Sequence, residues 1–228
     1  MNGFFISGTD TNVGKTVLSA LLVASLDAIY WKPIQTGAVE GTDRETVRQL
    51  ARVPEDQLVP ESYCFDPPVS PHLAAREAGA RICLETLSWP PTANYGAPDR
   101  PWIVEGAGGA LVPVNEHQTM IDVMRRIGLP VLIASRTALG TINHTLLTLM
   151  ALRCARLEVR GVVLIGDENT ENRRAIEHFG QTRVLGRIPR LASLERAALL
   201  RVFASSFDRA AFLARGGPAG IAVERSAF

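Results

Sequence analysis

Residues 8–16 have the residue types and spacing that bind phosphate. They read Gly-Thr-Asp-Thr-Asn-Val-Gly-Lys-Thr, close to the pattern G-x-x-x-x-G-K-[ST], with five residues instead of four between the glycines. The glycines let successive N–H groups point into one concavity, to which a following helix adds partial positive charge. In this pattern Lys15 reaches the β- and γ-phosphates and the Thr16 hydroxyl binds Mg²⁺. The segment predicts a P-loop that binds a nucleoside triphosphate with magnesium.

Two carboxylates could complete a metal site. Glu105 follows the apolar run Trp-Ile-Val, so it should end a buried strand at the edge where the phosphates lie. A carboxylate there is costly unless a cation or donor meets it, which favours a metal or substrate ligand over a turn carboxylate bonded to nearby N–H groups. Asp43 opens a predicted helix. It could be a ligand or simply the helix N-cap, a position that aspartate favours.

Two further features of the same sheet edge leave alternatives open. Lys32 precedes Pro33 at the end of a predicted strand. It could sit beside phosphate oxygens, or extend past Trp31 into solvent. The glycine-rich residues 106–109 could form an anion-binding nest of N–H groups or a plain tight turn.

The elements that must position these residues alternate between strand and helix. Periodicity predicts strands at 3–7, 29–32, 102–105, 130–135, 159–165 and 183–187, and helices at 15–26, 43–52, 71–79, 122–128, 139–155, 171–179 and 194–213. Residues 54–71 and 89–101 read as long loops, and 82–87 are ambiguous. The alternation predicts an α/β fold of the P-loop NTPase type, a parallel sheet with helices on both faces. We expect one domain over residues 1–215 and a flexible tail at 216–228.

Composition limits the class of protein. The 228 residues carry a formal charge of +1, which gives no sign of a nucleic-acid or membrane partner. Three widely spaced cysteines suggest reduced thiols, and the histidines lack metal-ligand spacing. No apolar run is long enough to span a membrane. We expect a soluble, cytoplasmic protein.

The motifs together resemble the ATP-dependent dethiobiotin synthetase family. The resemblance covers roughly residues 3–190, in the family's order. It rests on the P-loop, Trp-Lys-Pro-Ile-Gln-Thr-Gly at 31–37, Asp43, Ser-Pro-His at 70–72, Val-Glu-Gly-Ala-Gly-Gly at 104–109, and Leu-Gly-Thr-Ile-Asn-His at 139–144.

The resemblance implies an activity. The family joins 7,8-diaminopelargonate and CO₂ with ATP to give dethiobiotin, ADP and phosphate. One amine captures CO₂ as a carbamate, the carbamate oxygen attacks the γ-phosphate, and the second amine closes the ureido ring on the mixed anhydride. The family is a homodimer in which the substrate carboxylate lies on a helix N-terminus of the other subunit. Residues 70–74 and 112–114 are candidate walls for the apolar body of the substrate.

The resemblance also implies residue roles. Lys15 and Lys32 would be catalytic. The metal ligands would be Thr16, Asp43 and Glu105. The nucleotide would be bound by Asn12, Val13, Gly14, Lys15, Thr16, Val17, Glu105, Gly108, Pro189, Arg190 and Leu191. The substrate would be bound by Thr11, Thr36, Gly140, Thr141, Ile142 and Asn143.

Three departures from the family pattern matter. Asn12 stands where the family often has an acidic residue. The first helix and second strand are about five residues shorter than in the family pattern. The family often reads adenine with an asparagine where this chain has Ile165 or Gly166, so ATP is the default nucleotide and base preference stays open.

Other classes share the predicted fold. Partition and septum-positioning ATPases usually carry a Lys-Gly-Gly start to the loop, whereas this chain has Ser-Gly-Thr. ATP-dependent amidotransferase relatives need a glutaminase domain, for which the chain has no room. A nucleotide-binding protein without catalysis would not need Lys32, Asp43 and Glu105 together.

Overall fold

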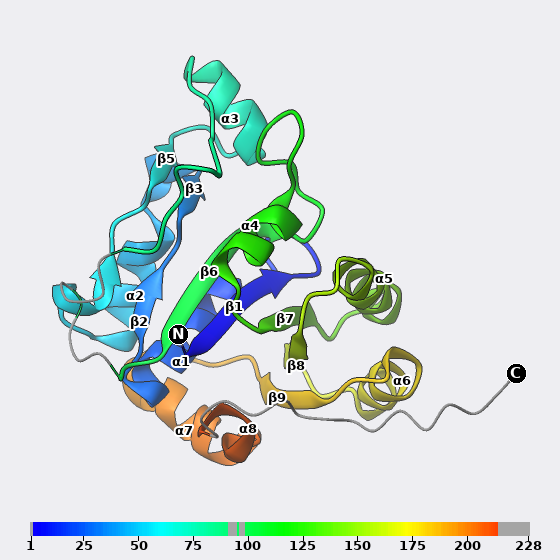
Figure 1. The fold of residues 1–228 in the computed structure, drawn as a ribbon. Helices are drawn as coiled ribbons and strands as arrows, with labels where there is room; N and C mark the ends of the chain where they lie inside the picture. Colours follow the sequence, from blue (N-terminus) through cyan, green and yellow to red (C-terminus); the bar gives the residue numbers. More distant parts are fainter. Residues whose placement is uncertain (1, 91–94, 96–98, 214–228) are drawn as a thin grey trace, which may run out of the picture.

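The computed structural model describes residues 2–90, 95 and 99–213. The predicted tail at 216–228 and residues 91–94 and 96–98 of the predicted 89–101 loop lie outside this range. Figure 1 shows a central sheet with helices packed around it.

The central sheet has seven parallel strands in the order β4-β2-β6-β1-β7-β8-β9. A second, two-stranded parallel sheet pairs β3 with β5. The strands are β1 Gly3–Gly8, β2 Ile29–Trp31, β3 Ile34–Thr36, β4 Leu58–Val59, β5 Tyr63–Phe65, β6 Trp102–Gly109, β7 Val131–Arg136, β8 Val159–Ile165 and β9 Val184–Ile188.

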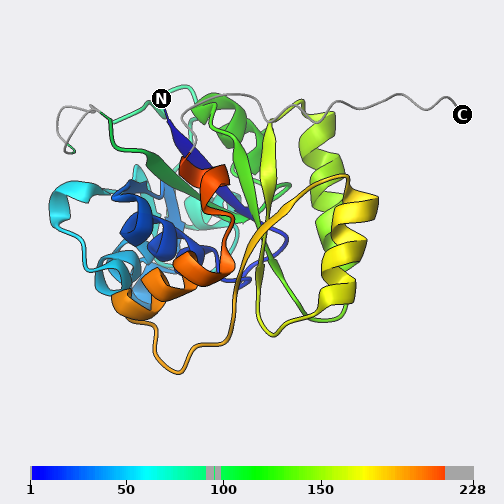
Figure 2. The same cartoon turned by 90° about the horizontal axis from the view of Figure 1, so that it is seen from below.

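Helices cover both faces of the central sheet, as the sequence predicts. Side chains alternate between two cores: Phe5 packs in one, with residues of α4, α5 and α6, and its neighbours Phe4 and Ile6 pack in the other, with residues of α1, α2 and α7. Figure 2 shows α5 and α6 on one side of the sheet and α1 and α7 on the other. The helices are α1 Lys15–Leu26, α2 Asp43–Ala51, α3 Pro71–Glu77, α4 Met120–Ile127, α5 Thr141–Cys154, α6 Thr170–Gly180, α7 Arg196–Ser206 and α8 Arg209–Leu213, with short 3₁₀ turns at Ala38–Glu40 and Glu55–Gln57.

Three sequence predictions were wrong. The stretch 54–71 is not an irregular loop, because it contains β4 and β5 and a 3₁₀ turn. The strand predicted to end at Glu105 continues as β6 through Gly109, so the glycines there do not form a tight turn. The single helix expected at 194–213 is broken at Phe207, whose ring packs where a side chain at Gly186 would lie and whose backbone bridges to that residue.

The parallel strands bring their carboxyl ends to one edge, where β1, β2 and β6 lie side by side. This edge carries the P-loop after β1, Lys32 after β2, and Glu105 within β6. Among the described residues, no helix combines the length and apolar character needed to cross a membrane.

Candidate active site

The P-loop joins β1 to α1 with two left-handed backbone positions. The φ angle is 52° at Asn12 and 96° at Gly14. A Cβ at Gly14 would lie 2.9 Å from Cδ1 of Ile165, so both conformation and space require glycine. The Nζ of Lys15 donates to the carbonyl oxygen of Asp10 at 3.3 Å, so this amine lies over the loop. The segment has the strand–loop–helix context that the sequence predicts.

Three predicted oxygen ligands converge at the start of α1. The Thr16 hydroxyl donates to Asp43 Oδ1 at 2.7 Å and lies 3.0 Å from Glu105 Oε1. Within the described residues no group of three or more His, Cys, Asp or Glu side chains is arranged to hold a metal ion. Mg²⁺ bound with phosphates needs only one or two carboxylates beside them, so a hydroxyl and two carboxylates fit this ion.

Glu105 is completely buried, and side chains satisfy it. Its Oε2 accepts hydrogen bonds from Ser19 Oγ at 2.7 Å and Tyr30 Oη at 3.0 Å. Its Oε1 faces Thr16 at 3.0 Å and Lys32 Nζ at 3.7 Å. The alternative of a turn carboxylate bonded to nearby N–H groups is therefore wrong. Burial, and then the charge of Glu105, raise the pKa of Tyr30 well above its usual value.

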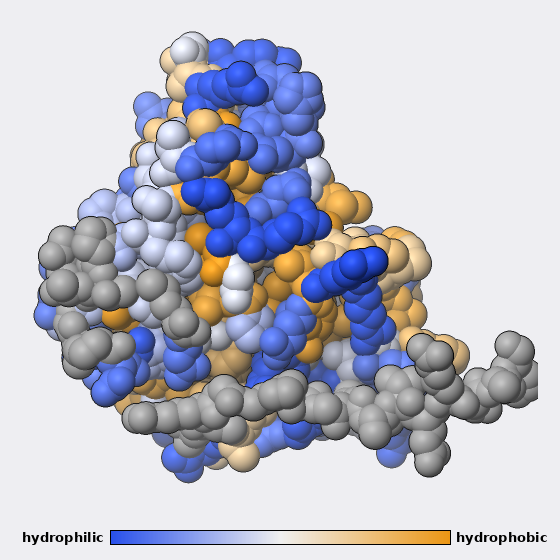
Figure 3. Space-filling view, viewed as in Figure 1, coloured by the Kyte–Doolittle hydropathy of each residue, from blue (hydrophilic) through white to orange (hydrophobic). Residues whose placement is uncertain are grey.

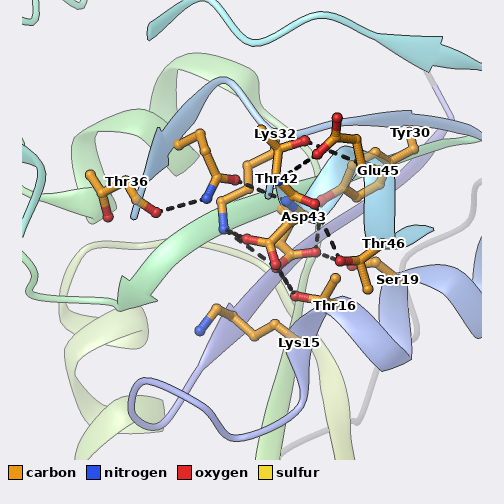
Figure 4. A network of polar contacts seen from close by, with 12 residues as sticks. Lys15, Thr16, Ser19, Tyr30, Lys32, Thr36, Thr42, Asp43, Glu45 and Thr46 are labelled. Atoms are coloured by element: carbon orange, nitrogen blue, oxygen red, sulfur yellow. Dashed lines mark hydrogen bonds and ion pairs between the residues drawn. The ribbon is translucent and has the colours of Figure 1, made fainter. Parts of the chain in front are cut away.

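Lys32 is a buried cation, not a solvated one. It is 7% exposed and forms ion pairs with Asp43 (Figure 4) and with Glu105. Burial alone would lower the pKa of Lys32, but the two carboxylates outweigh it and the pKa is raised. Lys15 differs: burial is the largest effect and lowers its pKa, against the opposing charge of Glu105. These are the only two lysines in the sequence.

Asp43 is free to face the site because another residue caps α2. Thr42 is the N-cap: its side chain accepts from the backbone N–H of Glu45, and the Glu45 side chain accepts from the backbone N–H of Thr42. Asp43 is the first helical residue, so the N-cap alternative was wrong. Burial would raise the pKa of Asp43, but Lys32 and the Thr16 hydroxyl lower it overall. Its backbone N–H donates to Gln35 Oε1 at 3.2 Å, a contact that sequence reasoning missed.

An apolar cavity of about 390 Å³ opens beside the P-loop. Val112 and Pro113 line it, whereas Val114 is fully buried and residues 70–74 do not line it. The sequence analysis did not predict that α5 forms one wall of this cavity. The apolar residues on the exposed face of this helix were a signal that something binds there. The lining residues are Thr9, Asp10, Thr11, Gly109, Ala110, Leu111, Val112, Pro113, His144, Leu147, Thr148 and Ala151.

The residues expected to bind the substrate carboxylate lie at the N-terminus of α5. Gly140 is the N-cap of α5, with φ of 92°, and α5 begins at Thr141. The cavity beside the P-loop of the same chain is not lined by any of residues 140–143. Thr141 is buried, and its hydroxyl lies 2.8 Å from Ser135 Oγ, which anchors the helix start.

Exposed apolar side chains gather near this helix. Leu139, Leu147 and Met150 are at least half exposed, as is Leu111 at the end of the neighbouring β6 segment. The space-filling view shows apolar surface over α5 (Figure 3). A patch of this kind typically marks an interaction site.

The remaining predicted contacts are two to the substrate, considered first, and three to the nucleotide. Thr11 is exposed on the P-loop and Thr36 ends β3, where its carbonyl accepts from Gln35 at 2.7 Å. Val13 is buried, so only its backbone is available to a ligand, and Val17 is partly buried in α1. Gly108 has φ of 68° near the end of β6.

The segment expected at the nucleotide base follows β9. Gly166 N–H donates to Ile188 O at 2.9 Å, which places Pro189, Arg190 and Leu191 beside the end of β8. Arg190 pairs with Asp167 at 3.1 Å. A Cβ at Gly166 would lie 2.4 Å from Thr137 Oγ1, so no side chain fits there to read a base.

A family model described as an AAA domain matches residues 2–198. Proteins named ATP-dependent dethiobiotin synthetase BioD are similar over nearly the whole chain. The relative from Rhodopseudomonas palustris (strain BisB5) is 49% identical, over 91% of this chain and 95% of that protein. The relative from Paramagnetospirillum magneticum is 50% identical over 87% and 93%, and that from Agrobacterium fabrum 48% over 92% and 96%.

A solved structure supports the fold alone. A ParA family ATPase from Chlorobium tepidum TLS matches with a TM-score of 0.54 and 12% identity, over 88% of this chain and 96% of that one. Sequence identity of nearly half over nine-tenths of the chain is the more specific finding. The chain therefore belongs to the ATP-dependent dethiobiotin synthetase family.

Proposed function

We propose that this chain closes the ureido ring of dethiobiotin from 7,8-diaminopelargonate and CO₂, with conversion of ATP to ADP and phosphate. The observation that carries the proposal is a P-loop whose Thr16 contacts Asp43 and the buried Glu105, both paired with the buried Lys32, and whose Thr9, Asp10 and Thr11 line an apolar cavity of about 390 Å³. The cavity suits the alkyl chain of the substrate, and the charged cluster suits phosphoryl transfer. The names of the family relatives support the same activity.

The proposed metal ligands are Thr16, Asp43 and Glu105, acting on Mg²⁺. When bound, this ion would neutralise charge on the β- and γ-phosphates. The chain's contribution is a set of oxygens held together before ligand binding, at 2.7 and 3.0 Å around the Thr16 hydroxyl. Preorganised groups of this kind need not be rearranged when charge develops in the transition state.

The two lysines have proposed catalytic roles. Nucleophilic attack of one substrate amine on CO₂ gives a carbamate, whose oxygen attacks the γ-phosphorus and displaces ADP. The second amine then attacks the carbonyl carbon of the mixed anhydride and displaces phosphate. Lys15 from the P-loop and Lys32, which follows β2, would stabilise the negative charge on the transferring group, since both are cations at the same sheet edge.

The remaining residues have proposed binding roles. Thr11 and Thr36 would contact the substrate, with Thr11 in the wall of the cavity. Residues 12–17, together with Gly108, would bind the phosphates, and residues 189–191 would cover the base. Because only glycine fits at 166, no side chain from that position can select adenine.

A homodimer is proposed to complete the substrate site. The N-terminus of α5, residues 140–143, does not line the cavity of its own chain, yet its N–H groups could bind a carboxylate. The exposed Leu139, Leu147 and Met150 would be covered in the dimer. The proposed compartment is the cytoplasm, where the free, exposed thiols of Cys64 and Cys154 stay reduced.

The test is phosphate release from Mg·ATP and bicarbonate, with and without 7,8-diaminopelargonate, and with the product identified by mass. Release that depends on the diamine, with dethiobiotin formed, is expected. Diamine-independent hydrolysis with every nucleoside triphosphate would contradict the proposal and leave a P-loop NTPase of another kind. Exchanging ATP for CTP, GTP and UTP in the same assay measures base preference.

A further inference from the structure

We propose that Tyr30 and Ser19 are positioning residues that fix the carboxylate of Glu105 so that only Oε1 faces the P-loop. The proposal rests on the proposed role of Glu105 as a metal ligand. It concerns the support of that ligand by residues that touch neither nucleotide nor substrate.

The two oxygens of Glu105 have different surroundings. Oε2 points into the protein and accepts from Ser19 at 2.7 Å and from Tyr30 at 3.0 Å. Oε1 points to Thr16 at 3.0 Å and Lys32 at 3.7 Å. An oxygen that accepts two hydrogen bonds has both lone pairs engaged, so Oε2 is not available to a metal. Glu105 would therefore bind through one oxygen.

The two hydroxyl donors come from separate elements. Ser19 lies one turn into α1, after the P-loop, and Tyr30 is the middle residue of β2. Both side chains are completely buried. The carboxylate is thus held between α1, the helix that follows the P-loop, and β2, the strand that precedes Lys32. Its orientation therefore depends on both elements.

Packing explains the aromatic ring of Tyr30 but not its hydroxyl group. Its ring lies in the apolar core on the α1 side of the sheet, where phenylalanine would fill the same space. Burying a hydroxyl there costs free energy unless it is hydrogen-bonded. Within the described part of the chain its hydrogen-bond partner is Glu105. The hydroxyl therefore acts through that carboxylate.

The experiment measures Mn²⁺ binding to the enzyme–AMP-PNP complex by electron paramagnetic resonance. Tyr30→Phe removes one oxygen and keeps the ring, and Ser19→Ala removes the other donor. Each should weaken Mn²⁺ binding about tenfold, the usual effect of losing a partner of a metal ligand. Glu105→Gln should weaken it more. Tyr63→Phe is the matched control, because its hydroxyl bonds to Cys83 O at 3.3 Å, away from Glu105.

A second readout separates positioning from damage to the fold. ADP binding without metal should stay within twofold of the parent in Tyr30→Phe, since the P-loop is untouched. The Mg²⁺ concentration for half-maximal turnover should rise, while kcat at saturating Mg²⁺ recovers most of its parent value.

Three results would overturn the proposal. Unchanged Mn²⁺ binding in Tyr30→Phe and Ser19→Ala, with a loss in Glu105→Gln, would overturn the positioning role alone. Equal weakening of Mn²⁺ binding and metal-free ADP binding would indicate a general disturbance and would also overturn it. Unchanged Mn²⁺ binding in Glu105→Gln would remove the metal assignment on which the proposal rests.

Discussion

Replacing Lys32 with methionine should destabilise the ligand-free protein more than an ordinary surface change does. The substitution keeps a long side chain but removes the cation that pairs with Asp43 and Glu105. Opposite unit charges 3.7 Å apart, the Lys32–Glu105 separation, attract by about 4.5 kcal/mol at an effective dielectric constant of about 20. Breaking a buried pair by removing one partner costs about 3–5 kcal/mol, which agrees with this figure.

The assay is urea unfolding followed by far-ultraviolet circular dichroism, at one protein concentration and without nucleotide or metal. Lys32→Met should lower the free energy of unfolding by about 3 kcal/mol or more. Combining it with Glu105→Gln, which removes the unpaired buried charge, should cost less than the sum of the two single changes. Arg125→Met is the control, because it breaks an exposed pair with Asp122 and should cost below about 1 kcal/mol.

The reasoning would be refuted by additive single changes or by a loss in Lys32→Met no larger than in Arg125→Met. Either result would mean that the hydroxyl donors of Thr16, Ser19 and Tyr30, and not Lys32, compensate the charge of Glu105. The cation would then contribute to ligand binding alone.

Four further predictions concern other parts of the molecule. Lys15→Ala should abolish nucleotide binding measured by calorimetry, and unchanged binding would contradict the P-loop assignment. Thr42→Ala should lower the free energy of unfolding by about 1 kcal/mol in urea titrations, because it removes the N-cap of α2. The lowered pKa of Asp43 stabilises the fold above its usual pKa of about 3.9, and this contribution is lost as pH falls through the folded-state pKa; Asp43→Asn should therefore show a shallower loss of stability with acid. Leu147→Asp should weaken self-association in analytical ultracentrifugation about tenfold or more, and an unchanged dimer would exclude the α5 face.

The sequence predicted the long, strongly patterned elements well. The bounds of α1 and β8 are those expected, because each combines regular apolar spacing with clear ends. Strands β3, β4 and β5 have only two or three residues, too few for a period to show, and lie among prolines. The break between α7 and α8 depends on the packing of Phe207 against Gly186, a tertiary contact that local pattern does not contain.

The candidate site divides in the same way. Glu105 and Lys32 were predictable because strand ends in a parallel sheet meet at one edge. Ser19 and Tyr30 were not, because each reads as an ordinary core position of an apolar helix or strand. Their partner Glu105 is 86 and 75 residues away in sequence, so only the folded chain brings the three together.

The scarcity of lysine has a consequence for labelling chemistry. All other basic side chains apart from histidine are arginines, so Lys15 and Lys32 are the chain's only side-chain amines. Both are buried at the same sheet edge, and only Lys15 has a lowered pKa, which increases the fraction of nucleophilic, uncharged amine. An amine-directed acylating reagent should therefore prefer Lys15 among the side chains. The α-amino group of the chain is the other amine that could react. Protection of Lys15 by nucleotide, read by peptide mass spectrometry, would report occupancy of this site without a reporter group added to the protein.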